Sequence, residues 1–297
     1  MVHKEVCPLC MSEEISLHLI CEDHFISKEV FEINNCRACG FLFTRDYPEE
    51  TDIGAYYDSE EYISHSDTPG GLTNTIYMLV RKIMLRIKRG IIRDVTGIDK
   101  GNILDIGSGT GHFADIMKEA GWKVKGIEIN KKARDFSINR FGLEVLEPSQ
   151  ISSLEPGWFD CITLWHVLEH FHDPFKYALE IRRLLKPGGI CLIALPNSSS
   201  FDALYYKVYW AAFDVPRHLW HFNPDTFRIF AEKTGFELVK IRTLPLDVFY
   251  ISILSENYKG TLMPFITGII KAKLFAIRSF FNTKRSSSLI YILRKPA

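Results

Sequence analysis

Glycines recur at alternate positions directly after a short apolar run in the middle of the chain. The run Asn102–Ile106 contains one acid, Asp105, and a helical pattern begins at Phe113. Between them stand three glycines: Gly107, Gly109 and Gly111. This order predicts a buried strand, a tight turn and a helix N-terminus, with which doubly wound α/β folds hold nucleotide-like ligands. Glycine lets the backbone approach such a ligand where a Cβ atom would collide.

Three ligand chemistries compete for such a loop. A Walker loop requires a lysine after its last glycine, and none follows here. A dinucleotide loop, Gly-x-Gly-x-x-Gly, requires its third glycine where His112 or Ala114 stands. Asp105 would oppose a pyrophosphate at the helix N-terminus but would favour a ligand that carries an ammonium group. These features favour S-adenosylmethionine, which has an α-ammonium group, a sulfonium and no phosphate.

The segments around this loop predict the sheet that positions it. Glu128 ends a second predicted strand, where its carboxylate can accept both hydroxyls of a ribose. The nearly continuous apolar run Phe159–His166 is typical of a parallel strand that is buried on both faces. Strands alternate with helical patterns of ten to fifteen residues, which predicts βαβ units and a parallel sheet.

Four of the seven cysteines form two C-x-x-C pairs: Cys7, Cys10, Cys36 and Cys39. Two such pairs suit a tetrahedral Zn²⁺ site of four thiolates. Residues 1–47 are therefore predicted to form a small zinc-ribbon-like β element. Such a short segment has too little core to fold alone, so the metal would supply much of its stability.

Composition sets further limits. The formal net charge is zero, but residues 1–70 carry 15 acidic and 4 basic side chains, whereas residues 257–297 carry 8 basic side chains and no acid. The start of the chain is polar, and no run of about 18 apolar residues occurs. Cysteines without a secretory signal favour a reducing compartment, so we expect a cytoplasmic protein.

The rest of the chain divides into a connector and one large domain. Residues 48–73 form a polar connector rich in tyrosine, and residues 74–297 the large domain, which opens with an amphipathic helix over 74–96. The domain carries an aromatic insert near 201–222 and a basic apolar insert near 257–285. A lid, a dimer face and a surface that contacts membrane lipid are alternative roles for these inserts.

Four segments in the correct order resemble class I S-adenosylmethionine-dependent methyltransferases of the ubiquinone-biosynthesis-like, small-molecule branch. They are Leu104–Phe113, Gly126–Asn130, Phe159–His170 and Leu184–Gly189. The resemblance implies a Rossmann-like, doubly wound, mostly parallel sheet of seven strands. It also implies a cofactor site made by Asp105, Gly107, Gly109, Gly111, Phe113, Glu128, Ile129, Gln150, Ile151, Trp165, His166 and His170. The N-terminal cysteines are similar to those of bacterial methyltransferases near sugar and polysaccharide pathways.

Methyl transfer is an in-line displacement, which requires alignment, a dry site and, for many acceptors, a general base. Two histidines, an arginine and a tryptophan lie together in residues 214–222. We predict His221 as the base, with His218 and then His166 as the alternatives. Arg217 would hold an anionic group of the acceptor. Trp220 and Tyr57 complete the predicted substrate site; a packed aromatic corner is the competing interpretation of this loop.

We therefore predict methyl transfer from S-adenosylmethionine to a small molecule, with a structural zinc ion. A sugar, a polysaccharide precursor and a lipid-linked or quinone-like compound are the candidate acceptors. A zinc-ribbon protein that binds nucleic acid, or an RNA methyltransferase, is the alternative, but the acidic N-terminal region opposes phosphate binding. An interaction module without activity is a third hypothesis, and the intact acids and glycines of the loop oppose it.

Overall fold

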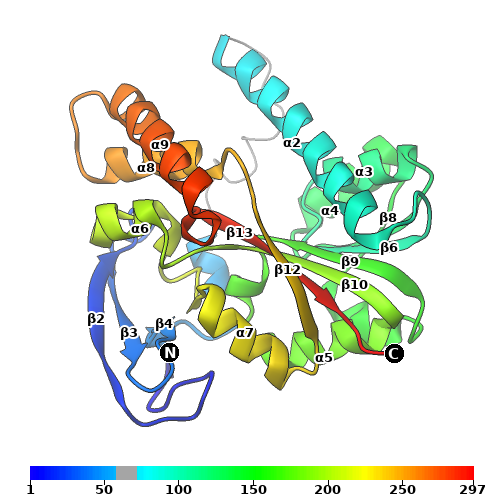
Figure 1. Ribbon diagram of the computed structural model, residues 1–297, viewed down its shortest axis with the longest axis horizontal. Coiled ribbons are helices and arrows are strands. Elements are labelled where there is room, and N and C mark those ends of the chain that lie inside the picture. The colour runs from blue at the N-terminus through cyan, green and yellow to red at the C-terminus, as the bar shows by residue number, and fades with distance from the viewer. Residues whose placement is uncertain (58–71) are drawn as a thin grey trace.

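A seven-stranded sheet forms the centre of the structure, a computed structural model that describes residues 1–57 and 72–297 (Figure 1). The strand order is β12-β13-β10-β9-β6-β7-β8. Its parallel strands are β6 (Asn102–Ile106), β7 (Lys123–Ile127), β8 (Glu144–Leu146), β9 (Phe159–Trp165) and β10 (Leu185–Pro196). Strand β13 (Ser288–Arg294) runs antiparallel between β10 and β12 (Glu237–Thr243). The predicted mostly parallel sheet of seven strands is confirmed; residues 58–71 of the predicted connector, Tyr62 included, lie outside the described residues.

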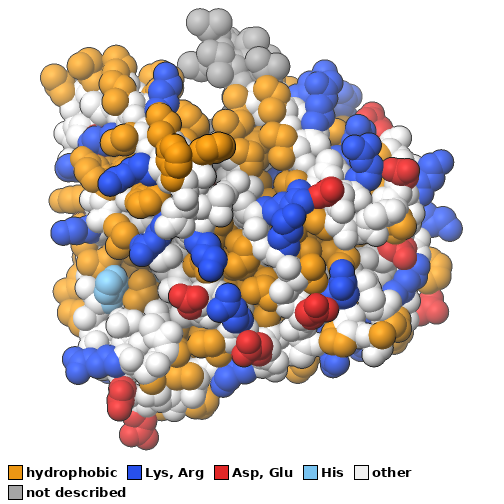
Figure 2. Space-filling view, viewed as in Figure 1, with side chains coloured by type: hydrophobic (Ala, Val, Ile, Leu, Met, Phe, Trp, Pro, Cys, Tyr) orange, Lys and Arg blue, Asp and Glu red, His pale blue; other side chains and the backbone are white. Residues whose placement is uncertain are grey.

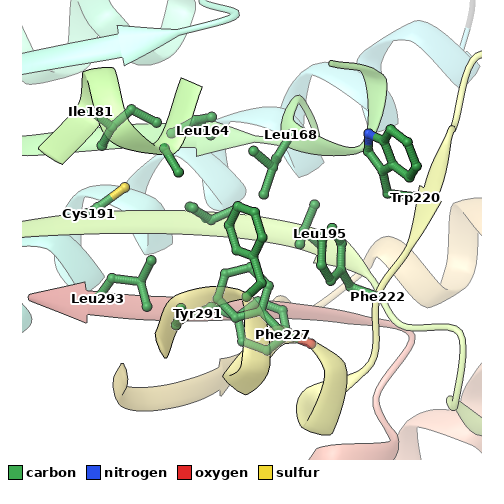
Figure 3. Packing of buried hydrophobic residues seen from close by; sticks show 14 of the residues in the cluster. Leu164, Leu168, Ile181, Cys191, Leu195, Trp220, Phe222, Phe227, Tyr291 and Leu293 are labelled. Atoms are coloured by element: carbon green, nitrogen blue, oxygen red, sulfur yellow. The ribbon is translucent and has the colours of Figure 1, made fainter. Parts of the chain in front are cut away.

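Helices cover both faces of this sheet, and the side-chain alternation of β10 shows how. Cys191, Ile193 and Leu195 point to the face covered by α5 (Pro174–Leu184) and α7 (Pro224–Lys233), where Figure 3 shows Cys191 and Leu195 in one apolar cluster. The intervening residues pack on the face covered by α2 (Leu72–Thr96) and α3 (His112–Glu119). A strand buried on both faces must be apolar at every position, which explains the continuous runs in the sequence.

Local capping fixes where the helices begin. The side chain of Asn130 accepts the Ala133 N–H at the start of α4 (Lys131–Phe141), and Asp173 accepts the Lys176 N–H at the start of α5. Asn223 forms a capping box with Thr226 at the start of α7. Short polar side chains at these positions satisfy N–H groups that the helix cannot pair itself.

A second, antiparallel sheet contains most of the N-terminal element. Its order is β11-β4-β3-β2, with β2 at Ile15–Glu22, β3 at Val30–Cys36 and β4 at Leu42–Thr44. The edge strand β11 is Trp220–His221, which the sequence places in the predicted acceptor loop. A small ladder of β1 (Val2–His3) and β5 (Asp46–Tyr47) lies beside it. The N-terminal element therefore shares a sheet with residues of the large domain.

The two inserts form one helical layer. It consists of α6 (Phe201–Tyr206), α8 (Asp247–Tyr258) and α9 (Pro264–Phe281), and its buried aromatic residues Trp210 and Phe213 pack in one cluster with Phe31 of β3. The remaining helical segments are 3-10 turns: η1 (Ile53–Tyr56), η2 (Pro148–Ser153), η3 (Leu168–His170), η4 (Lys207–Tyr209), η5 (Ala211–Phe213) and η6 (Thr283–Arg285). Within residues 1–57 and 72–297, no helix has both the length and the apolar character needed to span a membrane.

Candidate active site

The glycine loop joins β6 to α3 at the carboxyl edge of the parallel sheet. Gly107, Gly109 and Gly111 all have positive φ, at 71°, 53° and 79°. A Cβ atom on Gly107 would lie 2.4 Å from Val167 Cγ2, so this turn needs glycine to pack against the segment that follows β9. A Cβ atom on Gly109 would meet nothing within 4 Å. Val167 therefore packs against the loop at Gly107, whereas no protein atom fills the space beside Gly109.

Asp105 lies under this loop as a buried acid. Its Oδ1 accepts a hydrogen bond from the Thr163 hydroxyl at 2.7 Å, and among the described residues it has no ion-pair partner. Burial raises the pKa of Asp105 to about 7, against the lowering effects of Thr163 and of the distant Lys88. A bound ammonium group would stabilise the carboxylate form, so this site fits the methionine end of S-adenosylmethionine.

Glu128 follows β7 and is held by backbone N–H groups. Gly109 N donates to its Oε2 at 2.7 Å, and Asn130 N donates to its Oε1 at 2.8 Å. Each carboxylate oxygen keeps a further lone pair, which fits a ribose diol. The next residue, Ile129, is 78% exposed, so its side chain is open to contact with an adenine ring.

The other predicted cofactor residues divide into two groups. Phe113 and Trp165 form an edge-to-face pair at 5.4 Å, and Lys88 Nζ lies 4.3 Å from the centre of the Trp165 ring. The buried Trp165 indole N–H has no hydrogen-bond partner within the described residues. Gln150, by contrast, uses its Oε1 to accept the Glu147 N–H in the cap of η2, while the neighbouring Ile151 is buried. The amide oxygen of Gln150, which we predicted as part of the cofactor site, therefore already has a backbone partner.

His166 comes directly after β9 and has a φ of 59°. Its Nε2 lies 2.8 Å from Asp247 Oδ2 at the start of α8, and its Nδ1 lies 3.5 Å from Glu169 Oε1. Burial by itself lowers the pKa of His166, but Asp247 and Glu169 outweigh burial and raise the pKa to about 9. The ring is an imidazolium at neutral pH, and this argues against our prediction of His166 as an alternative base.

Glu169, His170 and His218 form a second polar group beside it, with one ligand atom of each within 4.8 Å of the others. His170 Nδ1 donates to the Arg217 carbonyl and lies 2.8 Å from the Tyr57 hydroxyl. His218 Nδ1 donates to the Ala212 carbonyl at 2.9 Å. The His170 ring therefore keeps a lone pair on Nε2. Glu169 is 1% exposed, and neither of its oxygens accepts a hydrogen bond within the described residues.

This arrangement can bind a hydroxyl group, because it offers an anionic acceptor and two imidazole nitrogens. The same three side chains have donor atoms that suit a divalent cation. Burial, followed by the nearby His218, lowers the pKa of His170 to about 4, so that ring is neutral at physiological pH. Since Val167 contacts Gly107, the group lies next to the glycine loop.

Two residues predicted for the acceptor site have structural partners instead. Arg217 is buried, and its Nη2 contacts Asp23 at 2.8 Å and Asp214 at 2.7 Å, so its fork is not open to an anionic acceptor. The Trp220 indole N–H donates to the Phe171 carbonyl inside the core, where Figure 3 places the ring beside the other buried side chains. These placements correct the substrate roles that we predicted for Arg217 and Trp220.

His221 lies in β11 and is 4% exposed. Its Nε2 is 3.2 Å from the Thr44 hydroxyl, and burial lowers its pKa well below the ordinary value. A base must reach its proton and hold it transiently, and neither condition is met here. The structure thus argues against our first choice of base.

The four cysteines of the C-x-x-C pairs converge, with all four sulfur atoms within 4.8 Å of one another. Cys7 Sγ and Cys39 Sγ are 3.6 Å apart, and Cys10 Sγ and Cys36 Sγ are 3.5 Å apart. A tetrahedral zinc with Zn–S bonds of about 2.3 Å places its sulfur atoms about 3.8 Å apart, so the set fits that ion. Burial raises the pKa of Cys39 to about 11, and a bound cation would offset this cost.

Sequence reasoning missed two charged residues of the site. Asp247 begins α8 and contacts His166, and Lys88 of α2 lies over Trp165. Lys88 was hidden among the many basic residues of one amphipathic helix, and Asp247 is a lone acid without a motif. Both reach the site only through tertiary packing.

Comparison with known proteins places this chain among methyltransferases. The sequence profile of a family described as "Methyltransferase domain" matches residues 81–241, which is more than half of the chain. A ubiquinone biosynthesis O-methyltransferase from Cupriavidus pinatubonensis is 26% identical over 181 residues, 55% of this chain and 72% of that protein. The protein of that name from Thiobacillus denitrificans is 33% identical over 107 residues, 33% of this chain and 45% of that protein.

Two solved structures share the fold. A 1,6-didemethyltoxoflavin-N1-methyltransferase from Burkholderia thailandensis has a TM-score of 0.53 and 16% identity, covering 92% of this chain and 99% of that one. Phosphoethanolamine N-methyltransferase 2 from Haemonchus contortus, in complex with S-adenosyl-L-methionine, has a TM-score of 0.53 and 16% identity, covering 95% and 69%.

The His166 ion cluster predicts a pH-dependent stability. Because the folded pKa is raised, protonated His166 stabilises the fold fully below the unfolded pKa of 6.5, and this contribution is lost as the pH rises through about 9. His166→Gln should therefore lower the free energy of unfolding by about 2 kcal/mol at pH 6 and by nearly nothing at about pH 10. Urea unfolding across this range measures the difference.

His3→Gln is the matched control, because His3 pairs with Asp46 at the surface. This variant should change the free energy of unfolding by less than about 0.5 kcal/mol at every pH. A His166→Gln deficit that stays constant between pH 6 and 10 would contradict the ion cluster.

Proposed function

This chain belongs to the methyltransferase domain family and is an S-adenosylmethionine-dependent methyltransferase, and we propose that it methylates a hydroxyl group of a small molecule held beside His218. The main support is the juxtaposition of two features at one sheet edge. The glycine loop with Asp105 and Glu128 provides a cofactor site, and the polar group of Glu169, His170 and His218 adjoins it through the Gly107–Val167 contact.

We assign the cofactor to residues on both sides of the loop. Asp105 would take the ammonium group, Glu128 the ribose hydroxyls, and Ile129 with Ile151 the adenine. When bound, S-adenosylmethionine supplies a methyl group activated by its sulfonium. The chain aligns the reactants and excludes water. The buried carboxyl ends of β6, β9 and β10 and the Trp165 ring are suited to this role.

His218 is the base that the hydrogen bonds support best. Its Nδ1–H is fixed on the Ala212 carbonyl, so the neutral ring offers Nε2 as the acceptor of a proton. Nε2 lies 4.0 Å from Glu169 Oε1 and 3.9 Å from Asp214 Oδ2. These two carboxylates would stabilise the imidazolium that forms when His218 takes the proton of the acceptor hydroxyl. His218 thus replaces His221 in the role of the base.

The class of acceptor is part of this proposal. Two relatives are named as ubiquinone biosynthesis O-methyltransferases, which supports a hydroxyl group on a quinone-like ring. A role in nucleic-acid binding has less support, because the zinc-ribbon-like region is acidic and its Asp23 forms a buried ion pair with Arg217.

We further propose a structural zinc ion held by Cys7, Cys10, Cys36 and Cys39. The convergence of four half-buried or buried thiols in a small sheet supports it. Zinc there would hold the turns before β2 and after β3, and thereby the sheet that β11 completes.

Calorimetry with S-adenosylmethionine tests the cofactor site. Glu128→Ala removes a bidentate acceptor and should weaken binding by about 10–100-fold. Glu144→Ala is the matched control, because this acid lies on neighbouring β8 and pairs with Lys125 at the surface. Equal affinities of Glu128→Ala and the unaltered protein would refute the assignment.

The base is tested by kinetics with a catechol or a quinol as the probe acceptor and release of S-adenosylhomocysteine as the readout. His218→Asn should lower kcat/KM by about 10²–10⁴-fold and leave the affinity for S-adenosylmethionine unchanged. His172→Asn, which alters a ring that contacts Tyr47 and the Pro48 carbonyl, should retain full activity. Full activity of His218→Asn would remove His218 from the mechanism.

Metal analysis tests the zinc site. The protein should contain about one equivalent of zinc per chain, and Cys36→Ser should lose it and unfold at lower urea concentration. Cys21→Ala is the control, since Cys21 is buried outside the cluster. A metal content that Cys36→Ser leaves unchanged would exclude this site.

A further inference from the structure

Packing within the protein leaves a large part of the apolar surface of the α8–α9 hairpin exposed. Helix α9 packs on α8 at Gly268, and its buried Phe275 contacts Tyr205 and Tyr206 of α6. A Cβ atom on Gly268 would lie 2.7 Å from the Ile253 Cα atom, so the two helices approach as closely as glycine permits. This one face of α9 accounts for its contacts with α8.

A second apolar face of α9 points away from the protein. Its residues recur at spacings of four, four, three and four, which places them in one stripe along the helix. They are Ile266, Ile270, Leu274, Ile277 and Phe281, and their exposed fractions lie between 51% and 83%. Leu262 before the helix is 94% exposed, and Phe280 at its end is 82% exposed. A single exposed leucine is ordinary, but a continuous stripe of this length marks an interaction surface.

The surroundings of the stripe are basic. Lys259, Lys273, Arg278 and Lys284 are exposed around it, and residues 257–297 contain no acid. Figure 2 shows hydrophobic and basic side chains intermixed over this hairpin. Two copies of this chain meeting face to face here would bring like charges together, whereas an anionic partner would be attracted.

Helix α2 carries a second exposed set of apolar and basic side chains. Its described residues Met78, Val80 and Ile83 are exposed, and Lys82 and Arg86 are exposed beside them. In Figure 1 the hairpin and the N-terminal half of α2 project from the same side of the molecule. Two amphipathic elements with basic margins that point the same way fit a flat surface better than a groove-shaped partner.

We propose that the exposed face of α9, together with the exposed residues of α2, docks this enzyme on an anionic lipid bilayer. The helix would lie in the plane of the interface, its stripe among the acyl chains and its lysines and arginines at the headgroups. Lys271, Lys273 and Arg278 interrupt the apolar sequence of α9, which suits an interfacial rather than a spanning helix. The inference goes beyond the proposed methyl transfer and does not depend on it.

Sedimentation with vesicles tests the proposal on the full chain. The protein should pellet with vesicles of phosphatidylcholine mixed with phosphatidylglycerol, much less with phosphatidylcholine alone, and less at high salt. The double variant Ile270→Ser with Ile277→Ser removes two side chains of the stripe and should lower partitioning by about tenfold or more. The control Val30→Ser with Leu179→Ser removes two equally exposed apolar side chains elsewhere and should partition as the unaltered protein does.

Two results would overturn the proposal. One is the absence of binding to anionic vesicles, or equal binding by the α9 variant. The other is a dimer in analytical ultracentrifugation that the α9 variant converts to a monomer, which would assign the stripe to a second copy of the chain. Calorimetry with S-adenosylmethionine on the same variant is independent of both, so a failure of the cofactor site is distinguishable from a failure of docking.

Discussion

The loop that carries His218 depends on the buried hydrogen bonds and ion pairs of the Arg217 guanidinium group. Removing a cation from water is costly unless its hydrogen bonds are all made, and Arg217 makes them to Asp23, Asp214 and the Tyr56 carbonyl. Asp23 itself accepts N–H groups from the turn that joins β2 to β3. A single side chain thereby links the N-terminal sheet, the described part of the connector and the loop that carries His218.

The histidines of the site differ by environment rather than by type. His166 lies between two carboxylates and is charged, whereas His170 and His221 are kept neutral by burial. In His218 one ring nitrogen is fixed on a carbonyl and the other faces carboxylates 4 Å away. These four chemically identical side chains thus differ in charge and in hydrogen-bond partners, and on these grounds we propose His218 as the base.

The sequence predicted those parts of the fold and site that local patterns determine. The glycine loop, Glu128 and the cysteine pairs each lie in segments whose spacing is itself the signal, and the apolar runs define the parallel strands. The roles of Arg217, Trp220 and His221 depend on partners far away in the chain, such as Asp23 and Thr44. From the sequence alone, all three residues could be assigned to substrate binding or catalysis, because their distant partners were not known. Asp247 was missed for the same reason, because its partner His166 lies 81 residues earlier in the chain.

The pairing of β11 with β4 has a consequence for the order in which the chain can fold. The contact between Thr44 and His221 spans 177 residues, so the N-terminal sheet lacks its edge strand until most of the large sheet has been synthesised. Until then β4 presents unpaired N–H and C=O groups, the feature by which nascent chains associate wrongly. The cysteine cluster closes a much shorter loop, from Cys7 to Cys39, and forms from residues that leave the ribosome early. A metal bound there would order the N-terminal sheet early, but the edge of β4 would stay open until Trp220 and His221 pair with it.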